Sequence, residues 1–267
     1  MPADGRLAPA GGPSTSDVQR ATPVTGVIPA IRSAITYVAI IAYIAAAAPL
    51  ALVVGAVLRW KGGMYALGHV GVWLALSLAG IRYRVSGRQR VPPGAAVVFC
   101  SNHESNVDPP VLFRALHPRL HIFYKAELRR FPVMQTVFDV GGFIPIERAN
   151  RERAMTSIER GAASLRAGNS FLIFPEGTRS RTGELLAFKK GGFIMALDAQ
   201  VPIVPVAIQG GRASMRKGSA VVRPVHVSVK IGAPIPTLGL SSADRDALIA
   251  RVRAEIQHLL DEGPVWS

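Results

Sequence analysis

Two long apolar stretches near the beginning of the chain predict its first elements. Residues 34–58 contain no charged side chain, and as a helix they would span about 37 Å, enough to cross a hydrocarbon core of about 30 Å. Pro49 lies in the middle of this stretch and should kink the helix. A second apolar stretch, residues 64–81, follows a basic and aromatic segment and a Gly62-Gly63 turn. The two stretches predict a helical hairpin.

Three interpretations of this hairpin compete. A secretory signal peptide fits poorly, because the apolar run begins after 33 residues and continues past the alanine-rich stretch 45–48. A hairpin buried in a soluble core would suit the second stretch alone, but the first is too long and too apolar for it. We therefore favour membrane association. Too few Lys and Arg residues flank the hairpin to decide between crossing the bilayer and lying in one leaflet.

From residue 82 onward, short apolar runs alternate with helical patterns, which indicates an α/β fold. Residues 81–85 alternate like an edge strand, and residues 225–231 alternate like a half-exposed strand. The expected buried strands are 95–100, 122–124, 171–174 and 203–208, and the expected helices are 151–166, 191–199 and an amphipathic helix over 248–260.

These patterns divide the chain into four parts. Residues 1–30 are rich in Pro, Ala, Gly, Ser and Thr without a hydrophobic period, so we expect a disordered leader. Residues 31–83 are assigned to the membrane-associated hairpin and residues 84–240 to the α/β domain. Residues 241–267 are assigned to a C-terminal amphipathic helix and tail, which begins with a sequence that resembles a capping box.

Composition narrows the classes of partner. The 267 residues carry 31 Lys and Arg against 17 Asp and Glu, a formal net charge of +14. A basic protein of this kind suits nucleic acid or an anionic membrane. Aromatic residues make up only 7%, which is thin for base stacking, and no recognition motif supports nucleic acid, so we expect no nucleic-acid partner. The hairpin favours the membrane.

A single cysteine, Cys100, excludes a disulfide framework and a cysteine-rich metal site. We expect no metal and no cofactor. The simplest context for such a chain is a membrane-associated protein whose catalytic domain faces the cytoplasm.

The first candidate for chemistry follows the expected strand 95–100. His103 and Asp108 stand five residues apart in the stretch Ser101–Pro109. A carboxylate on one imidazole nitrogen fixes the tautomer and leaves the other nitrogen to act as a general base toward a hydroxyl. The spacing alone is weak support, and a histidine satisfied at a helix start is the simpler alternative. The position directly after a buried strand favours the catalytic interpretation.

The second candidate follows the expected strand 171–174. Glu176, Gly177, Thr178 and Arg179 come directly after a proline at its end. Gly177 permits close approach of the backbone to a ligand. Thr178 and backbone N–H groups can bind phosphate oxygens, and Arg179 can do so with two hydrogen bonds. A solvated turn with a surface arginine is the alternative.

Taken together, these motifs resemble the glycerolipid acyltransferases, specifically the 1-acylglycerol-3-phosphate acyltransferases. The ordered blocks cover about residues 95–210. They are Asn102, His103 and Asp108; Gly142 to Arg148; the full run Phe174 to Ser180, with Phe188 to Gly191 after it; and Val201 to Val206. Lys125 stands before the second block in a Lys-x-Glu-Leu context. A complete match over the third block makes the resemblance specific.

The resemblance implies a mixed sheet flanked by helices and an acyl transfer from acyl-CoA or acyl-carrier protein to a lipid hydroxyl, with membrane lipids as partners. It assigns His103 and Asp108 to catalysis. Lys125, Arg148 and Arg179 would hold the acceptor phosphate. Glu176 would act through its loop or on a glycerol hydroxyl.

One departure bears on the acceptor. The second block often carries Asp or Asn before its arginine, and this chain has Glu147 there, with Pro145 inside the run. Another lysolipid or a glycerol phosphate therefore remains an alternative acceptor. An inactive membrane-anchored lipid-binding protein is a further alternative, although intact His103 and Asp108 argue against it.

Overall fold

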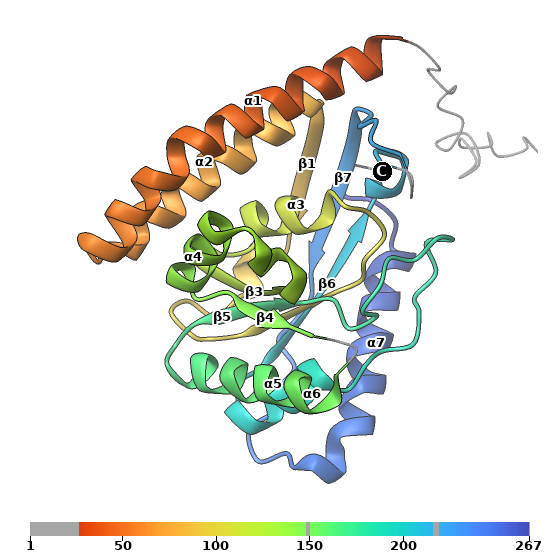
Figure 1. Cartoon of the computed structure of the whole chain (residues 1–267). Coiled ribbons are helices and arrows are strands. Elements are labelled where there is room, and N and C mark those ends of the chain that lie inside the picture. Colours follow the sequence, from red (N-terminus) through yellow and green to blue (C-terminus); the bar gives the residue numbers. More distant parts are fainter. Residues whose placement is uncertain (1–26, 148–149, 216–218, 267) are drawn as a thin grey trace, which may run out of the picture.

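The computed structural model describes residues 27–147, 150–215 and 219–266 (Figure 1). A seven-stranded sheet at its centre has the order β1-β7-β6-β2-β5-β3-β4. Five neighbouring strands run parallel to one another: β6, β2, β5, β3 and β4. Strand β7 is antiparallel to β6, and β1 is parallel to β7. The expected mixed α/β sheet is therefore confirmed. Its strands are β1 (Ile81–Ser86), β2 (Val98–Ser101), β3 (Leu120–Lys125), β4 (Ile144–Ile146), β5 (Ser170–Ile173), β6 (Ile203–Gln209) and β7 (Val225–Ile231).

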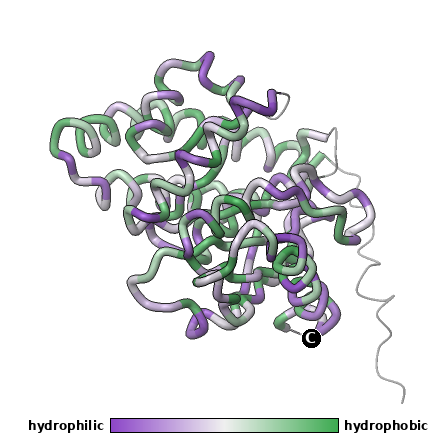
Figure 2. Tube along the Cα trace, turned by 90° about the horizontal axis from the view of Figure 1, so that it is seen from below, coloured by the Kyte–Doolittle hydropathy of each residue, from purple (hydrophilic) through white to green (hydrophobic). Residues whose placement is uncertain are grey.

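Helices cover both faces of the sheet, and each face has its own apolar core. Residues of α5, α6 and α7 pack against one face, while the end of α2 and α3 pack against the other. Figure 2 shows hydrophobic segments within the molecule and also at its outer edge, where hydrophilic segments lie between them. The helices are α1 (Val27–Leu52), α2 (Lys61–Ala79), α3 (Asp108–Ala115), α4 (Pro132–Gly141), α5 (Arg151–Arg166), α6 (Gly191–Ala199) and α7 (Arg245–Asp261).

The helices α1 and α2 form the expected hairpin, which lies across one side of the α/β unit (Figure 1). By length and composition, two helical segments could cross a membrane: Val27–Val57, which is α1 with the π-helical turn η1 (Val53–Val57), and Lys61–Ala79. Most apolar side chains of the first segment are exposed rather than packed in the protein, whereas most of those on α2 are half-buried or buried. A surface of this kind normally contacts lipid or another protein.

The turn of the hairpin differs from the expectation. Gly62 and Gly63 lie inside α2, and the chain reverses at Arg59, which adopts a left-handed φ of 52°. The indole of Trp60 packs directly over Gly63, where a Cβ would lie 2.5 Å from a ring carbon. The two glycines therefore make room for the tryptophan, and the turn prediction at Gly62-Gly63 was wrong.

The boundaries between the four predicted parts of the chain also differ from the structure. Helix α1 begins at Val27, inside the expected leader, whose residues 1–26 lie outside the described residues. Strand β1 begins at Ile81 and pairs with β7, so the hairpin ends at Gly80 rather than at residue 83. Helix α7 buries Leu248, Val252 and Ile256 in the same core as the sheet, so it is part of the α/β unit.

Strand β7 is less exposed than its alternation predicts. Ser228 and Lys230 are buried because the C-terminal segment covers them. The N–H of Val265 donates to Ser228 Oγ at 3.0 Å, and Lys230 Nζ lies 2.9 Å from Glu262 Oε2. The expectation of a half-exposed strand was wrong because the alternation of residues along β7 does not reveal that the C-terminal segment covers the strand.

Candidate active site

The candidate residues gather at one edge of the sheet because neighbouring parallel strands end there. His103 follows β2, Glu176 follows β5, and Lys125 is the last residue of β3. Strands β2, β5 and β3 are adjacent and parallel, so their carboxyl ends open on the same crevice. Lys125 is exposed and pairs in register with Ile146 of β4. Arg148, two residues beyond Ile146, lies outside the described residues.

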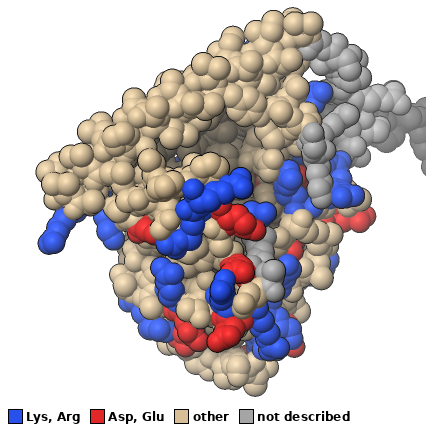
Figure 3. Space-filling model, viewed as in Figure 1, with Lys and Arg blue, Asp and Glu red and all other residues tan. Residues whose placement is uncertain are grey.

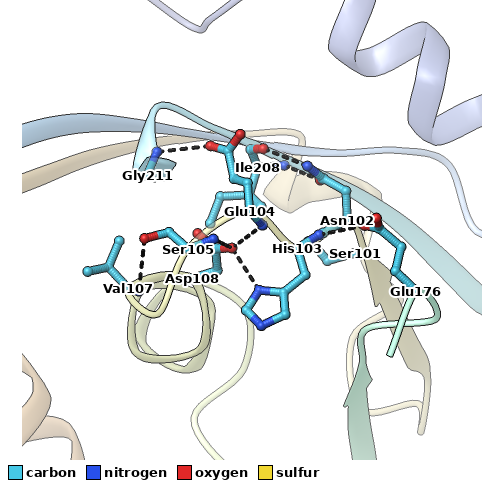
Figure 4. Close-up of polar contacts among 10 residues, drawn as sticks. All are labelled: Ser101, Asn102, His103, Glu104, Ser105, Val107, Asp108, Glu176, Ile208 and Gly211. Atoms are coloured by element: carbon cyan, nitrogen blue, oxygen red, sulfur yellow. Dashed lines mark hydrogen bonds and ion pairs between the residues drawn. The ribbon is translucent and has the colours of Figure 1, made fainter. Parts of the chain in front are cut away.

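The side chains of His103 and Asp108 contact each other directly (Figure 4). His103 Nδ1 lies 2.8 Å from Asp108 Oδ2, and the Asp108 side chain is fully buried. This contact fixes Nδ1 as the protonated nitrogen and leaves Nε2 as the acceptor. Among the described residues no hydrogen-bond partner reaches Nε2, and 16% of the His103 side chain is exposed. Nε2 is therefore the nitrogen that a substrate can approach.

Asp108 is held by the loop that precedes it. The backbone N–H groups of Glu104 and Ser105 both donate to Asp108 Oδ2 at 2.7 Å. Asp108 also begins α3, whose N-terminal end favours a negative charge. Three donors and a helix end thus stabilise the negative charge at Oδ2. The second oxygen, Oδ1, is also buried and has no hydrogen-bond partner among the described residues.

The loop after β5 holds the backbone of His103. Glu176 Oε1 accepts a hydrogen bond from the His103 N–H at 2.8 Å, and Oε2 accepts one from the Leu186 N–H at 3.0 Å. The N–H of Ser180 donates to the His103 carbonyl at 2.8 Å. Of the two roles left open for Glu176, these bonds favour the one within its loop. The ring of Phe174 stacks on the His103 imidazole with centroids 4.2 Å apart.

Comparisons with known proteins agree with this geometry. The family model described as Acyltransferase matches residues 82–209. A 1-acyl-sn-glycerol-3-phosphate acyltransferase of Borreliella burgdorferi is 30% identical over 188 residues, which cover 70% of this chain and 75% of that protein. The chain belongs to the acyltransferase family.

A plant relative and a solved structure extend the comparison. The 1-acyl-sn-glycerol-3-phosphate acyltransferase of Limnanthes douglasii is 33% identical over 177 residues, 66% of this chain and 62% of that protein. This chain thus spans about three fifths of the plant protein. The crystal structure of the 1-acyl-sn-glycerophosphate (LPA) acyltransferase PlsC from Thermotoga maritima has the same fold, with a TM-score of 0.76, 24% identity, and coverage of 90% of this chain and 98% of that chain.

The third block of this acyltransferase turns sharply at Gly177. Its φ of +69° favours glycine, and a Cβ there would lie 2.8 Å from Lys189 Nζ. The ammonium of Lys189 therefore lies against this turn. Thr178 is exposed and Arg179 is half-buried, so both side chains are accessible at the same edge as His103.

Sequence reasoning missed a second support of the catalytic loop. Glu104 Oε1 accepts a hydrogen bond from the Gly211 N–H at 3.0 Å, which ties the loop to η4 (Gly211–Ala213), just after β6. A Cβ on Gly211 would lie 2.7 Å from Asp108 Oδ1. Burial and the charge of Asp108 raise the pKa of Glu104 to about 7. In the sequence, the adjacent glycines Gly210 and Gly211 after β6 were the signal that could have indicated this close contact.

Two further residues of the acyltransferase support the same loop. The amide of Asn102 pairs with Ile208 of β6: its Nδ2 donates to the carbonyl at 2.9 Å, and its Oδ1 accepts from the N–H at 2.8 Å. The thiol of Cys100 is fully buried, and burial raises its pKa. A thiol of this kind is not a nucleophile at neutral pH.

Proposed function

We propose that this acyltransferase moves a fatty acyl group from acyl-CoA or acyl-carrier protein to the free hydroxyl of 1-acylglycerol 3-phosphate, giving phosphatidic acid. The observation that carries the proposal is the 2.8 Å contact between His103 Nδ1 and the buried Asp108 carboxylate, which leaves Nε2 without a hydrogen-bond partner among the described residues on a partly exposed side chain. This arrangement is that of a general base for a hydroxyl. Relatives named as 1-acyl-sn-glycerol-3-phosphate acyltransferases support the choice of acceptor.

The reaction needs one base and no covalent enzyme intermediate. Nε2 of His103 takes the proton of the acceptor hydroxyl as its oxygen attacks the thioester carbonyl. The C–O bond forms, and the tetrahedral intermediate then breaks its C–S bond. The imidazolium returns the proton to the leaving thiolate. Asp108 keeps the imidazole in the required tautomer and stabilises the imidazolium. The Glu176 carboxylate and the Ser180 N–H bind the backbone of His103 and fix its position.

The acceptor phosphate is assigned to the side of His103 on which β5, β3 and β4 end. Arg179 follows β5, Lys125 ends β3, and Arg148 follows β4 in the sequence. Cations that follow neighbouring strand ends suit a phosphomonoester dianion, and a guanidinium can bind it with two hydrogen bonds. Gly177 and Thr178 contribute the turn that carries Arg179.

The hairpin would place this crevice at a membrane surface. Its exposed apolar side chains suit the bilayer, and Figure 3 shows Lys and Arg gathered on the α/β unit beside a hollow under the hairpin. A basic surface next to an apolar anchor favours an anionic leaflet. The lipid acceptor would thus be concentrated at the depth of His103, with the α/β unit on the cytoplasmic side.

The test is acyl transfer by the purified full-length protein. Acyl-CoA is incubated with a panel of lyso-acceptors, thiol release is followed, and the product is identified by mass. Thiol release that depends on 1-acylglycerol 3-phosphate and gives phosphatidic acid supports the proposal. Transfer only to a different lysolipid would change the acceptor, and no transfer to any acceptor would contradict the reaction.

A further inference from the structure

A second concave site lies on β1 and β7, away from the residues assigned to catalysis. It is a groove of about 430 Å³ lined by Arg82, Tyr83, Arg84, His226 and Trp266. Ile81, Tyr83 and Val85 of β1 pack into the core beneath α2 and α3. Because side chains alternate along a strand, Arg82 and Arg84 project from the other face of the sheet, opposite the apolar hairpin.

The groove carries positive charge from two arginines. Arg82 and Arg84 are both exposed, and among the described residues no acidic side chain pairs with either guanidinium. His226 is also exposed and lies opposite Arg82 in the register of β1 and β7. The ring of Trp266 lies against His226 with centroids 5.8 Å apart. Two arginines beside aromatic rings form a surface suited to a phosphorylated ligand with a planar ring.

The groove is linked to the catalytic loop through two adjacent glycines. Gly210 packs so closely on β7 that a Cβ there would lie 2.3 Å from the His226 carbonyl oxygen. Gly211 packs against Asp108 on its other side and donates to Glu104. In the sheet order, β1 is three places from β2, which at the usual strand spacing is about 14 Å.

The groove and the acceptor site lie on opposite sides of His103. Strand β2, which leads to His103, is the central strand of the seven. The cations assigned to the acceptor phosphate follow β5, β3 and β4, whereas the groove lies on β7 and β1. The groove also faces away from the apolar side of the hairpin, so its position favours a water-soluble ligand over a lipid headgroup.

We propose that this groove binds the nucleotide end of the acyl donor, with the phosphates of CoA on Arg82 and Arg84 and the adenine against Trp266. The inference rests on the proposed acyl transfer. In acyl-CoA a long pantetheine arm separates the thioester from the phosphates, and it can reach from the groove past Gly210 and Gly211 to His103. An acyl-carrier protein would bring its single phosphodiester to the same edge but has no adenine for the tryptophan.

The direct test is nucleotide binding, which needs no turnover. The probe is adenosine 3′,5′-bisphosphate, titrated calorimetrically into purified full-length protein in detergent. R82A/R84A should weaken binding by about tenfold or more, the scale of lost hydrogen bonds to a charged group, and W266L should weaken it as well. R160A/R251A removes the same charge from exposed positions on α5 and α7 and should bind like wild type.

A kinetic test separates this inference from the proposed function. The kcat/KM advantage of acyl-CoA over acyl-pantetheine should fall about tenfold in R82A/R84A and stay unchanged in R160A/R251A. Unchanged nucleotide affinity in R82A/R84A would overturn the groove assignment even if acyl transfer is intact. The assignment would also be overturned if the wild type binds no nucleotide and R82A/R84A instead loses binding to acyl-carrier protein or to anionic vesicles. Nucleotide binding that depends on the arginines without any acyl transfer would support the site and contradict the reaction.

Discussion

The carboxylate of Glu176 accepts a hydrogen bond from the backbone N–H of His103 at 2.8 Å, across 73 residues of sequence. Its second oxygen accepts from the Leu186 N–H at 3.0 Å. One buried side chain thus connects the loop that carries the base to the loop that carries Arg179. This relationship gives Glu176 a positioning role that can be tested separately from substrate binding.

Glu176→Gln should lower both stability and turnover. The amide keeps one acceptor oxygen but presents an NH₂ group to the second N–H, so one buried donor loses its partner at a cost of about 1–3 kcal/mol. The free energy of unfolding and kcat are measured together. Glu184→Gln, on the exposed part of the same loop, is the matched control and should change neither. Unchanged kcat in Glu176→Gln would show that this bond does not position His103.

Glu104 should make stability depend on pH. Its pKa is raised from 4.5 to about 7, so between these values the folded protein keeps a proton that the unfolded chain has released. The free energy of unfolding therefore falls as pH rises through this window. Glu104→Gln cannot ionise and keeps an acceptor oxygen for Gly211, so it should flatten that decline. Thermal unfolding at several pH values measures it, and equal slopes for variant and wild type would contradict the assignment.

The hairpin should hold the protein on membranes. Ile35, Val38 and Ile41 are all more than half exposed on α1, so the triple serine variant should bind vesicles more weakly, because apolar burial in the bilayer is lost. Leu238→Ser, at an exposed apolar position of the α/β unit, is the control and should bind as wild type does. Release of the full-length wild-type protein into the soluble fraction by carbonate or high salt would refute the membrane assignment.

Arg179 should act on the acceptor rather than on the donor. Arg179→Ala should raise the acceptor KM by an amount equivalent to about 2–3 kcal/mol, and Arg179→Lys by less, because an ammonium replaces a two-bond fork with a point charge. The donor KM should move much less, as uniform binding of the acceptor phosphate predicts. Arg181→Ala, two residues later and exposed, is the control. A change in the donor KM alone would show that Arg179 binds the acyl donor instead of the acceptor.

Local pattern predicted much of this fold because the relevant signals are local. Strand β6 and helix α5 lie where their apolar periods place them, and Ser241 and Asp244 form the expected capping box. The three-residue strand β4 contains a proline and gives no period, so pattern could not find it. The hairpin turn at Arg59 escaped prediction because the packing of Trp60 on Gly63 overrides the usual turn preference of glycine.

In the candidate site, too, the features with a local sequence signal were predicted and those that depend on distant contacts were not. The spacing of His103 and Asp108 was visible in the sequence, and the structure brings the two side chains together. The contacts from Glu176 to His103 and from Glu104 to Gly211 join segments 73 and 107 residues apart. Such pairs depend on strand order and register, which the sequence of a single chain does not encode in any local pattern.

The central claim is that His103, oriented by Asp108, is the base for acyl transfer to 1-acylglycerol 3-phosphate. The most direct measurement compares phosphatidic acid formation by purified wild type, His103→Ala and Asp108→Asn, with the product identified by mass and folding checked by thermal unfolding. We predict that the wild type forms the product and that His103→Ala is slower by about 100-fold or more. Asp108→Asn should also lose much of its activity, because an amide supports the wrong tautomer. A folded His103→Ala variant with near wild-type turnover would contradict the account.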